Sequence, residues 1–201
     1  KQTYFLKERQ YFESLEKAQN PKTLVVACCD SRVDPAILLH CKPGDLFVIR
    51  NVAALVPAVT QASNPCSVMS AIEYGVKHLN VEHIVVMGHS HCGGIHGLMT
   101  PESIAGETYI QDWVSIASPA LERLQAMTGD EDEKTRSRHC EEGAVLISLD
   151  NLLSYPWIAE RVKNGQLKLH ALYYDLSEGN LYRFSPDSED FELLFHTIEN
   201  P

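Results

Sequence analysis

Residues 24–35, LVVACCDSRVDP, place reactive side chains directly after four apolar residues. Residues 24–27 are typical of a short buried strand, and reactive groups at the end of a strand indicate a site rather than a core. Because side chains alternate along an extended backbone, Cys28 and Asp30 point to one side and Cys29 to the other. We therefore expect Cys28 and Asp30 to belong to the site, and Cys29 to pack in the core.

A second segment repeats this arrangement. Residues 82–90, EHIVVMGHS, predict another buried strand, and His89 and Cys92 follow its apolar part. Ligands bind beyond the carboxyl ends of the strands in open parallel sheets, so the two segments should face one crevice. Together the two segments, 28–32 and 88–94, offer thiolate, carboxylate and imidazole groups, which is a zinc ligand set. Gly93 and the glycine after it let a helix begin tightly behind Cys92.

Helices and strands alternate along the rest of the chain. Strands are expected at 45–53, 167–176 and 180–185, and helical patterns lie between them. This order predicts an α/β fold with a mainly parallel central sheet flanked by helices. The chain should be one domain, residues 1–201, with an N-terminal helical arm at 1–20 and an α/β core at 21–201. The charged stretch 129–138 is interpreted as a solvated loop.

Composition excludes some partners. The 201 residues carry a formal net charge of −10, which argues against nucleic acid and anionic membranes. No apolar run approaches the roughly 20 residues that span a bilayer. The six cysteines are interpreted as ligands and buried apolar residues of a reducing compartment, hence the cytoplasm. An organelle stays open, because the chain begins at Lys1 and a presequence could have been removed.

The residues alone leave three kinds of site open: a structural zinc site, a redox pair and a catalytic metal site. Adjacent cysteines do not form the C-x-x-C motif of redox proteins, so the redox hypothesis is weak. A structural zinc has no use for Asp30 with Arg32 alongside. These residue types therefore favour catalytic zinc.

The combined motifs resemble those of the β-class carbonic anhydrases. The resemblance runs over nearly the whole chain: C-x-D-S-R at 28–32, PGDLFVIRNVA at 43–53, AIEYGVKHL at 71–79, GHSHCGG at 88–94, EEGAVLISLDNLL at 141–153 and LHALYYDL at 169–176. It implies one zinc per chain, bound by Cys28, His89 and Cys92. It also implies that Asp30 and Arg32 form a catalytic pair.

The resemblance implies an activity and an assembly. The expected reaction is the reversible hydration of carbon dioxide to bicarbonate and a proton by zinc-bound hydroxide. The expected assembly is a homodimer, or a higher multiple of dimers such as a tetramer, in which the N-terminal arm packs against the partner subunit. Asp30 would orient the hydroxide, and Arg32 would hold the Asp30 carboxylate away from the metal.

Two subgroups of the family differ in how the site is controlled. One subgroup closes the site when bicarbonate occupies a pocket of tryptophan, arginine and tyrosine. Arg50 and Tyr174 match the last two positions, but Val25 stands where the tryptophan would be. We therefore expect the open subgroup, in which Gln61 after Leu-Val-Pro binds substrate, and we add Gly93 to the substrate-binding residues.

Two other functions are carried as alternatives. Relatives in the same family hydrolyse carbonyl sulfide or carbon disulfide at the same type of zinc site, and the motifs at the metal would look alike. The third hypothesis is a catalytically inactive protein that zinc stabilises and that binds a partner. The intact Asp30–Arg32 pair argues against it, because an inactive site has no need of both residues. Other residues near the site are expected to have structural roles or none. Asp34 caps a helix, His91 takes no part in the site, and Asp45 forms a structural ion pair with Arg50.

Overall fold

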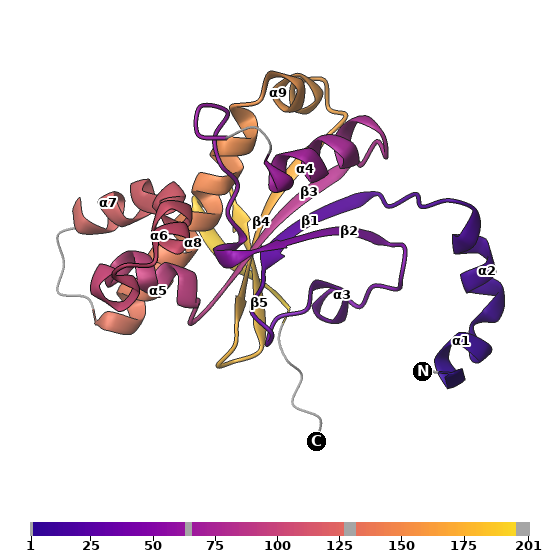
Figure 1. The fold of residues 1–201 in the computed structure, drawn as a ribbon, viewed down its shortest axis with the longest axis horizontal. Helices are drawn as coiled ribbons and strands as arrows, with labels where there is room; N and C mark the ends of the chain where they lie inside the picture. The colour runs from indigo at the N-terminus through magenta and orange to yellow at the C-terminus, as the bar shows by residue number, and fades with distance from the viewer. Residues whose placement is uncertain (1, 63–65, 127–131, 196–201) are drawn as a thin grey trace.

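The protein is built on one six-stranded sheet (Figure 1). The computed structural model describes residues 2–62, 66–126 and 132–195. In the sheet order β2-β1-β3-β4-β5-β6, the first four strands run parallel and the last two are antiparallel additions. The strands are β1 (Thr23–Cys28), β2 (Leu46–Asn51), β3 (His83–His89), β4 (Lys168–Asp175), β5 (Asn180–Ser185) and β6 (Asp190–Phe195). The predicted mainly parallel α/β sheet is confirmed.

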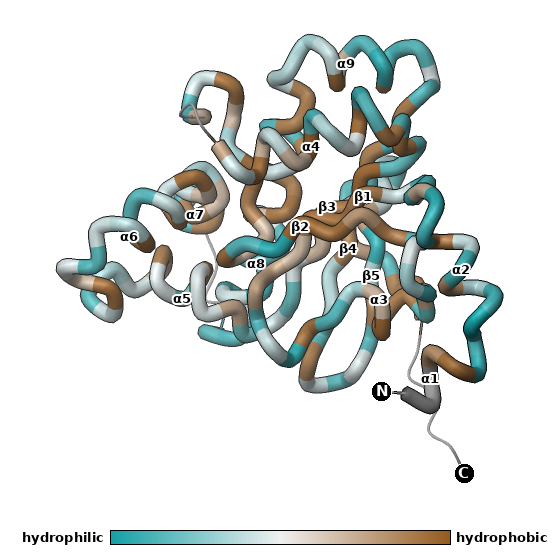
Figure 2. The backbone as a smooth tube through the Cα atoms, turned by 45° about the vertical axis from the view of Figure 1, so that its right-hand side comes forward, coloured by the Kyte–Doolittle hydropathy of each residue, from teal (hydrophilic) through white to brown (hydrophobic). Residues whose placement is uncertain are grey.

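β1 and β3, the inner pair of the four parallel strands, are apolar on both faces, as parallel strands covered by other layers must be. Residues 24–28 of β1 and 84–89 of β3 are all buried, and these strands form the hydrophobic centre of the tube in Figure 2. In β1, Leu24 and Val26 join one apolar cluster, while Val25 and Ala27 join a second cluster on the other face. Burial on both faces fixes the position of these strands and therefore of whatever follows their carboxyl ends.

Helices cover the sheet unequally. α4 (Ser67–Lys77), α8 (Glu133–Leu153) and α9 (Pro156–Lys163) contribute to the large cluster on one face. The short α3 (Pro35–Leu38) contributes Leu38 to the cluster on the other face. α5 (Gly93–Met99), α6 (Thr108–Val114) and α7 (Ser118–Ala126) form a further group, with the short helices η1 (Val52–Ala54), η2 (Pro101–Ile104) and η3 (Ser115–Ala117). This group encloses the Cys28 and Cys92 side chains.

The antiparallel edge was only half predicted. β5 pairs with β4 as expected, after a turn in which Gly179 has φ of +70°. β6 pairs with β5 at the edge of the sheet, and no pattern in its residues predicts it. Only Phe191 of its six residues is buried, so the alternation that identifies a half-buried strand is missing.

The stretch 129–138 is not wholly a loop. α8 begins at Glu133, so the predicted solvated loop is wrong for its second half. The Asp132 carboxylate accepts a hydrogen bond from the Thr135 N–H at 2.8 Å, which is an N-cap interaction. Residues 127–131 lie outside the described part of the chain.

The N-terminal arm is helical but broken into α1 (Gln2–Lys7) and α2 (Arg9–Lys17) at Glu8, whose φ/ψ of −111°/26° is not helical. The arm projects from the body of the molecule (Figure 1). Tyr11 fastens it there by donating a hydrogen bond from its hydroxyl to the Pro43 carbonyl at 2.5 Å. Phe5 and Leu6 expose half or more of their surface.

Across residues 2–62, 66–126 and 132–195, no helix combines the length and the apolar character that crossing a membrane requires.

Candidate metal centre

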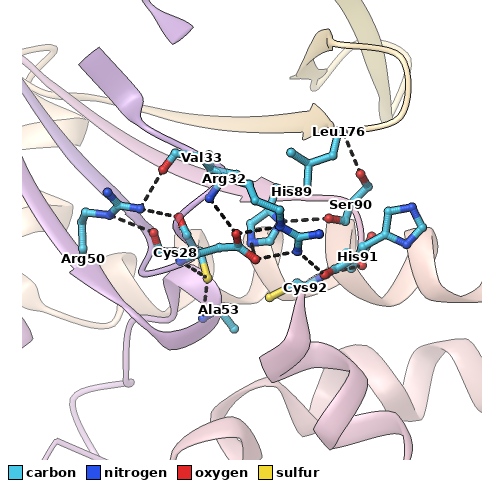
Figure 3. A network of polar contacts seen from close by, with 12 residues as sticks. Cys28, Arg32, Val33, Arg50, Ala53, His89, Ser90, His91, Cys92 and Leu176 are labelled. Carbon is cyan, nitrogen blue, oxygen red and sulfur yellow. Dashed lines mark hydrogen bonds and ion pairs between the residues drawn. The ribbon is translucent and has the colours of Figure 1, made fainter. Parts of the chain in front are cut away.

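Three buried side chains converge where two neighbouring strands end (Figure 3). Cys28 is the last residue of β1, His89 is the last residue of β3, and Cys92 is the N-cap of α5. The potential ligand atoms of these three residues all lie within 4.8 Å of one another. The strands are adjacent and parallel, so the predicted meeting of the two sequence segments is what the structure has.

His89 has a ring nitrogen available for a metal. Its Nδ1 lies 2.9 Å from the Ser90 carbonyl oxygen, which can only accept, so Nδ1 carries the proton. Its Nε2 is buried and has no hydrogen-bond partner among the described residues. A buried unpaired nitrogen is costly, and a histidine held by a carbonyl at its other nitrogen is the usual arrangement of a metal ligand.

The two cysteines also favour a cation. The Cys28 Sγ accepts hydrogen bonds from the N–H groups of Asp30 and Ala53 at 3.4 and 3.3 Å. A hydrogen bond from the Cys92 thiol lowers the pKa of Cys28, and the same bond together with burial raises the pKa of Cys92. Cys28 therefore loses its thiol proton easily. Cys92 loses its proton with difficulty unless a cation takes the place of that proton. Two thiolates and one imidazole suit zinc, and the residues present fit that ion.

Asp30 and Arg32 form a two-point pair beside the three candidate ligands. Arg32 donates from Nε to Asp30 Oδ1 at 2.9 Å and from Nη2 to Oδ2 at 2.7 Å, and its backbone N–H donates to Oδ1 at 2.9 Å. These hydrogen bonds hold the pKa of Asp30 well below its usual range. The Asp30 Oδ2 lies 3.9 Å from Nε2 of His89, so the carboxylate borders the candidate ligands while it faces the guanidinium.

Arg50 has a different role from the one expected. From β2, it donates from Nε to the Cys28 carbonyl at 3.0 Å and from Nη2 to the carbonyls of Asp30 and Val33, both at 2.7 Å (Figure 3). The expected pair with Asp45 is wrong, because the Asp45 carboxylate instead accepts from the Lys42 N–H at 2.7 Å. Arg50 thus fixes the course of the loop that carries both Cys28 and Asp30.

Cys29 corrects the prediction made from strand alternation. Its side chain is exposed instead of packed in the core. The alternation itself holds, but β1 ends at Cys28, and the apolar layer that covers Val25 and Ala27 does not extend past the strand end. Asp34 caps α3 as expected, accepting from the N–H groups of Ala36 and Ile37.

The two residues assigned to substrate binding stay predictions. Gln61 is exposed, and its side-chain oxygen accepts a hydrogen bond from the Ala58 N–H at 3.0 Å, within its own turn. Gly93 lines a cavity of about 740 Å³ that also reaches His96, Arg138 and Tyr173. The structure thus places Gly93 beside Cys92, while the interactions of Gln61 stay within residues 58–61.

Gly94 is the glycine at this helix start that cannot carry a side chain. A Cβ there would lie 2.7 Å from Val52 Cγ1 and 3.0 Å from Ala53 Cβ, whereas a Cβ on Gly93 would meet nothing within 4 Å. We expect Gly94→Ala to lower the free energy of unfolding by about 1–3 kcal/mol through overpacking. Gly93→Ala is the matched control, and chemical denaturation of the two variants is the measurement. Equal stability of both variants would contradict this packing.

A Cys–His–Cys triad with an adjoining aspartate–arginine pair, held at the ends of parallel strands, defines an α/β protein with a candidate mononuclear metal centre. Known proteins similar to this chain point to the same kind of protein. The profile of the family described as "Carbonic anhydrase" matches residues 23–181. The chain is 39% identical over 188 residues to "Beta carbonic anhydrase 5, chloroplastic" of Arabidopsis thaliana, covering 93% of this chain and 62% of that protein. It is 40% identical over 195 residues to "Beta carbonic anhydrase 6, mitochondrial" of the same plant, covering 95% and 67%.

Solved structures show the same fold. The β-carbonic anhydrase CcaA matches with a TM-score of 0.90 and 31% identity, covering 95% of this chain and 92% of that one. A tetrameric β-carbonic anhydrase of Sordaria macrospora matches with a TM-score of 0.76 and 30% identity, covering 91% and 90%. The chain belongs to the β-class carbonic anhydrase family, whose cofactor is zinc. It spans 62% and 67% of the length of the two plant relatives.

Proposed function

We propose that the protein catalyses the reversible hydration of carbon dioxide: carbon dioxide and water give bicarbonate and a proton. The proposal gives each chain one zinc, bound by Cys28, His89 and Cys92. The observation that carries it is the Asp30–Arg32 pair, which borders a set of three candidate ligands. A structural zinc site usually closes with four protein ligands, whereas a catalytic one keeps a position open.

The residues have separate tasks in this reaction. Zinc bound there would act as a Lewis acid that makes water nucleophilic near neutral pH. Asp30 accepts a hydrogen bond from the attacking water and orients it toward the carbon of the substrate. Arg32 holds Asp30 by two parallel hydrogen bonds and so keeps its carboxylate from filling the open position. Arg50 keeps the loop that carries Asp30 in place through its carbonyls.

We further propose the open-site subgroup. Closure by bicarbonate would need an arginine free to bind it, and the guanidinium of Arg50 already donates to three carbonyls. Val25, at the position of the subgroup's tryptophan, is fully buried and joins an apolar cluster. Both observations support a site that stays open at neutral pH with water as the partner of the metal.

An oligomer is part of the proposal. The arm exposes Phe5 at 50% and Leu6 at 64% of their surface, which a second copy would cover, and the Sordaria macrospora relative is described as tetrameric. We propose a homodimer or a multiple of dimers. The compartment stays a prediction: cytoplasm is expected from cysteine usage, while the two plant relatives carry the names of organelles.

The test is stopped-flow hydration of carbon dioxide with zinc content measured on the same sample. We expect one zinc per chain and a rate far above the uncatalysed one. Carbonyl sulfide and carbon disulfide are supplied in parallel assays, because the alternative function predicts their hydrolysis instead. One zinc per chain without hydration of carbon dioxide would overturn the proposal.

A further inference from the structure

A buried carboxyl group lies directly behind Cys92. Glu141, on α8, exposes 5% of its surface. One of its oxygens accepts a hydrogen bond from the Cys92 N–H at 3.0 Å, and the other accepts from the Tyr173 hydroxyl at 2.7 Å. No salt bridge to Glu141 occurs within the described ranges, whereas its neighbour Glu142 pairs with Arg138 at 2.8 Å. Burying a carboxyl group without a cation is costly, so this position calls for an explanation.

The peptide that Glu141 contacts makes a sharp turn. His89 and Cys92 are only three residues apart, and both must reach the same centre. His91, between them, has φ of +57°, in the left-handed region that a residue with a side chain seldom occupies. Such a conformation persists only where its surroundings impose it.

Both ends of this peptide are held. Its carbonyl group, on His91, accepts a hydrogen bond from Arg32 Nη2 at 3.1 Å, and its N–H group, on Cys92, donates to Glu141. Arg32 is the residue that also holds Asp30. The peptide between two candidate ligands is therefore fixed from one side by the Asp30–Arg32 pair and from the other side by α8.

α8 supports the same region at a second point, one turn further along. A Cβ on Gly88 would lie 2.5 Å from Cγ2 of Val145, so the helix packs closely on β3 just before His89. Residues four apart in a helix lie on one face, and Glu141 and Val145 are four apart. The end of β3 and the start of α5 thus rest on one face of α8.

We propose that Glu141 is a positioning residue for the metal ligand Cys92: its carboxyl group holds the His91–Cys92 peptide and so directs the Cys92 Sγ toward Cys28 and His89. The inference rests on the proposed ligand set. Hydrogen bonds behind the ligands of a metal typically contribute 10- to 100-fold in metal affinity. Glu141 acts on the metal only through Cys92.

The test is zinc affinity, measured by competition with a chromophoric chelator on the wild type and three variants. Glu141→Leu removes both acceptor oxygens, and we expect zinc affinity to fall about 10- to 100-fold. Glu141→Gln keeps an acceptor but loses the stronger charge-assisted bond, so an intermediate loss of about 3- to 10-fold is expected. Glu142→Gln is the matched control, an adjacent buried carboxyl group that does not touch Cys92, and should bind zinc like the wild type.

A second readout separates positioning from general destabilisation. Cobalt(II) replaces zinc, and the thiolate-to-cobalt absorption bands should shift in Glu141→Gln but not in Glu142→Gln. Should Glu141→Leu fail to fold, Glu141→Gln decides. Zinc affinity and cobalt spectrum of Glu141→Gln that match those of Glu142→Gln would overturn the role of Glu141. A wild type that binds no zinc would instead overturn the ligand set itself.

Discussion

Cys28→Ser is expected to lose the zinc and at least about 1000-fold of the hydration rate, while Cys29→Ser keeps both. The two cysteines are neighbours in the sequence, but only the Cys28 Sγ lies close to the potential ligand atoms of His89 and Cys92. Serine is a poor ligand for zinc at neutral pH because its hydroxyl keeps its proton. Losing one of three protein ligands therefore removes most of the binding free energy of the metal.

The adjacent cysteine makes this comparison sharp. Cys29 is exposed, so its replacement by serine changes neither packing nor ligation, and zinc content and stopped-flow rates are measured on both variants. Zinc retained by Cys28→Ser, or lost from Cys29→Ser, would contradict the assignment of the ligands.

The Asp30–Arg32 pair gives the second large effect. Asp30→Asn is expected to keep one zinc per chain and to lose about 100- to 10,000-fold of the hydration rate, the range typical of a positioned acid or base. The amide can no longer accept two parallel hydrogen bonds from Arg32, and it cannot orient water as a carboxylate does. Retained zinc with lost activity distinguishes this variant from the ligand variants.

Arg32→Gln tests the same pair by removing the guanidinium that donates to Asp30. Without the guanidinium, the pKa of Asp30 rises toward its ordinary value, and its carboxylate is free to turn toward the metal. We expect retained zinc and a loss of activity comparable to that of Asp30→Asn. Full activity in Arg32→Gln would show that the hydrogen bonds to Arg32 are dispensable.

The pair also has a predictable pH dependence. Because Arg32 lowers the pKa of Asp30, Asp30 stays ionised above its ordinary pKa of about 4 and is protonated only well below it. The stability contributed by the pair is therefore present above about pH 4 and is lost as the pH falls through the lowered pKa. A fall in hydration rate between about pH 8 and pH 6 must then come from another group. The pH–rate profile of the wild type, followed to about pH 5, should show no separate step from Asp30.

The sequence could predict the site where periodicity and strand ends determine it. Apolar runs before Cys28 and before His89 marked two strands, and parallel pairing brought their ends together. Alternation identified the inward side of β1, but it could not tell where the covering layer stops, which is why Cys29 was misplaced. The role of Arg50 depends on backbone carbonyls across a strand pair, and side-chain patterns carry no information about those.

Glu141 is not among the site residues predicted from the sequence, although the sequence holds a signal for its burial. It lies on the same helical face as Val145, Ser148 and Leu152, all of which are buried. An acidic residue on an apolar stripe indicates a buried carboxyl group. What it holds could not be predicted, because the partner peptide at Cys92 lies 49 positions away and meets it only in the folded chain.

Arg50 stabilises the loop of residues 28–33 through hydrogen bonds to its backbone, and this affects which side chains of the loop can be replaced. The hydrogen bonds that it donates there go to main-chain oxygens, at Cys28, Asp30 and Val33, while the Asp34 carboxylate lies further off, 4.0 Å from Nη1. A main-chain oxygen is the same whichever side chain follows, so the exposed positions 29 and 31 are open to variation while the loop keeps its path. Substitutions at these two positions should therefore alter the surface beside the candidate metal centre while the backbone of the loop stays in place.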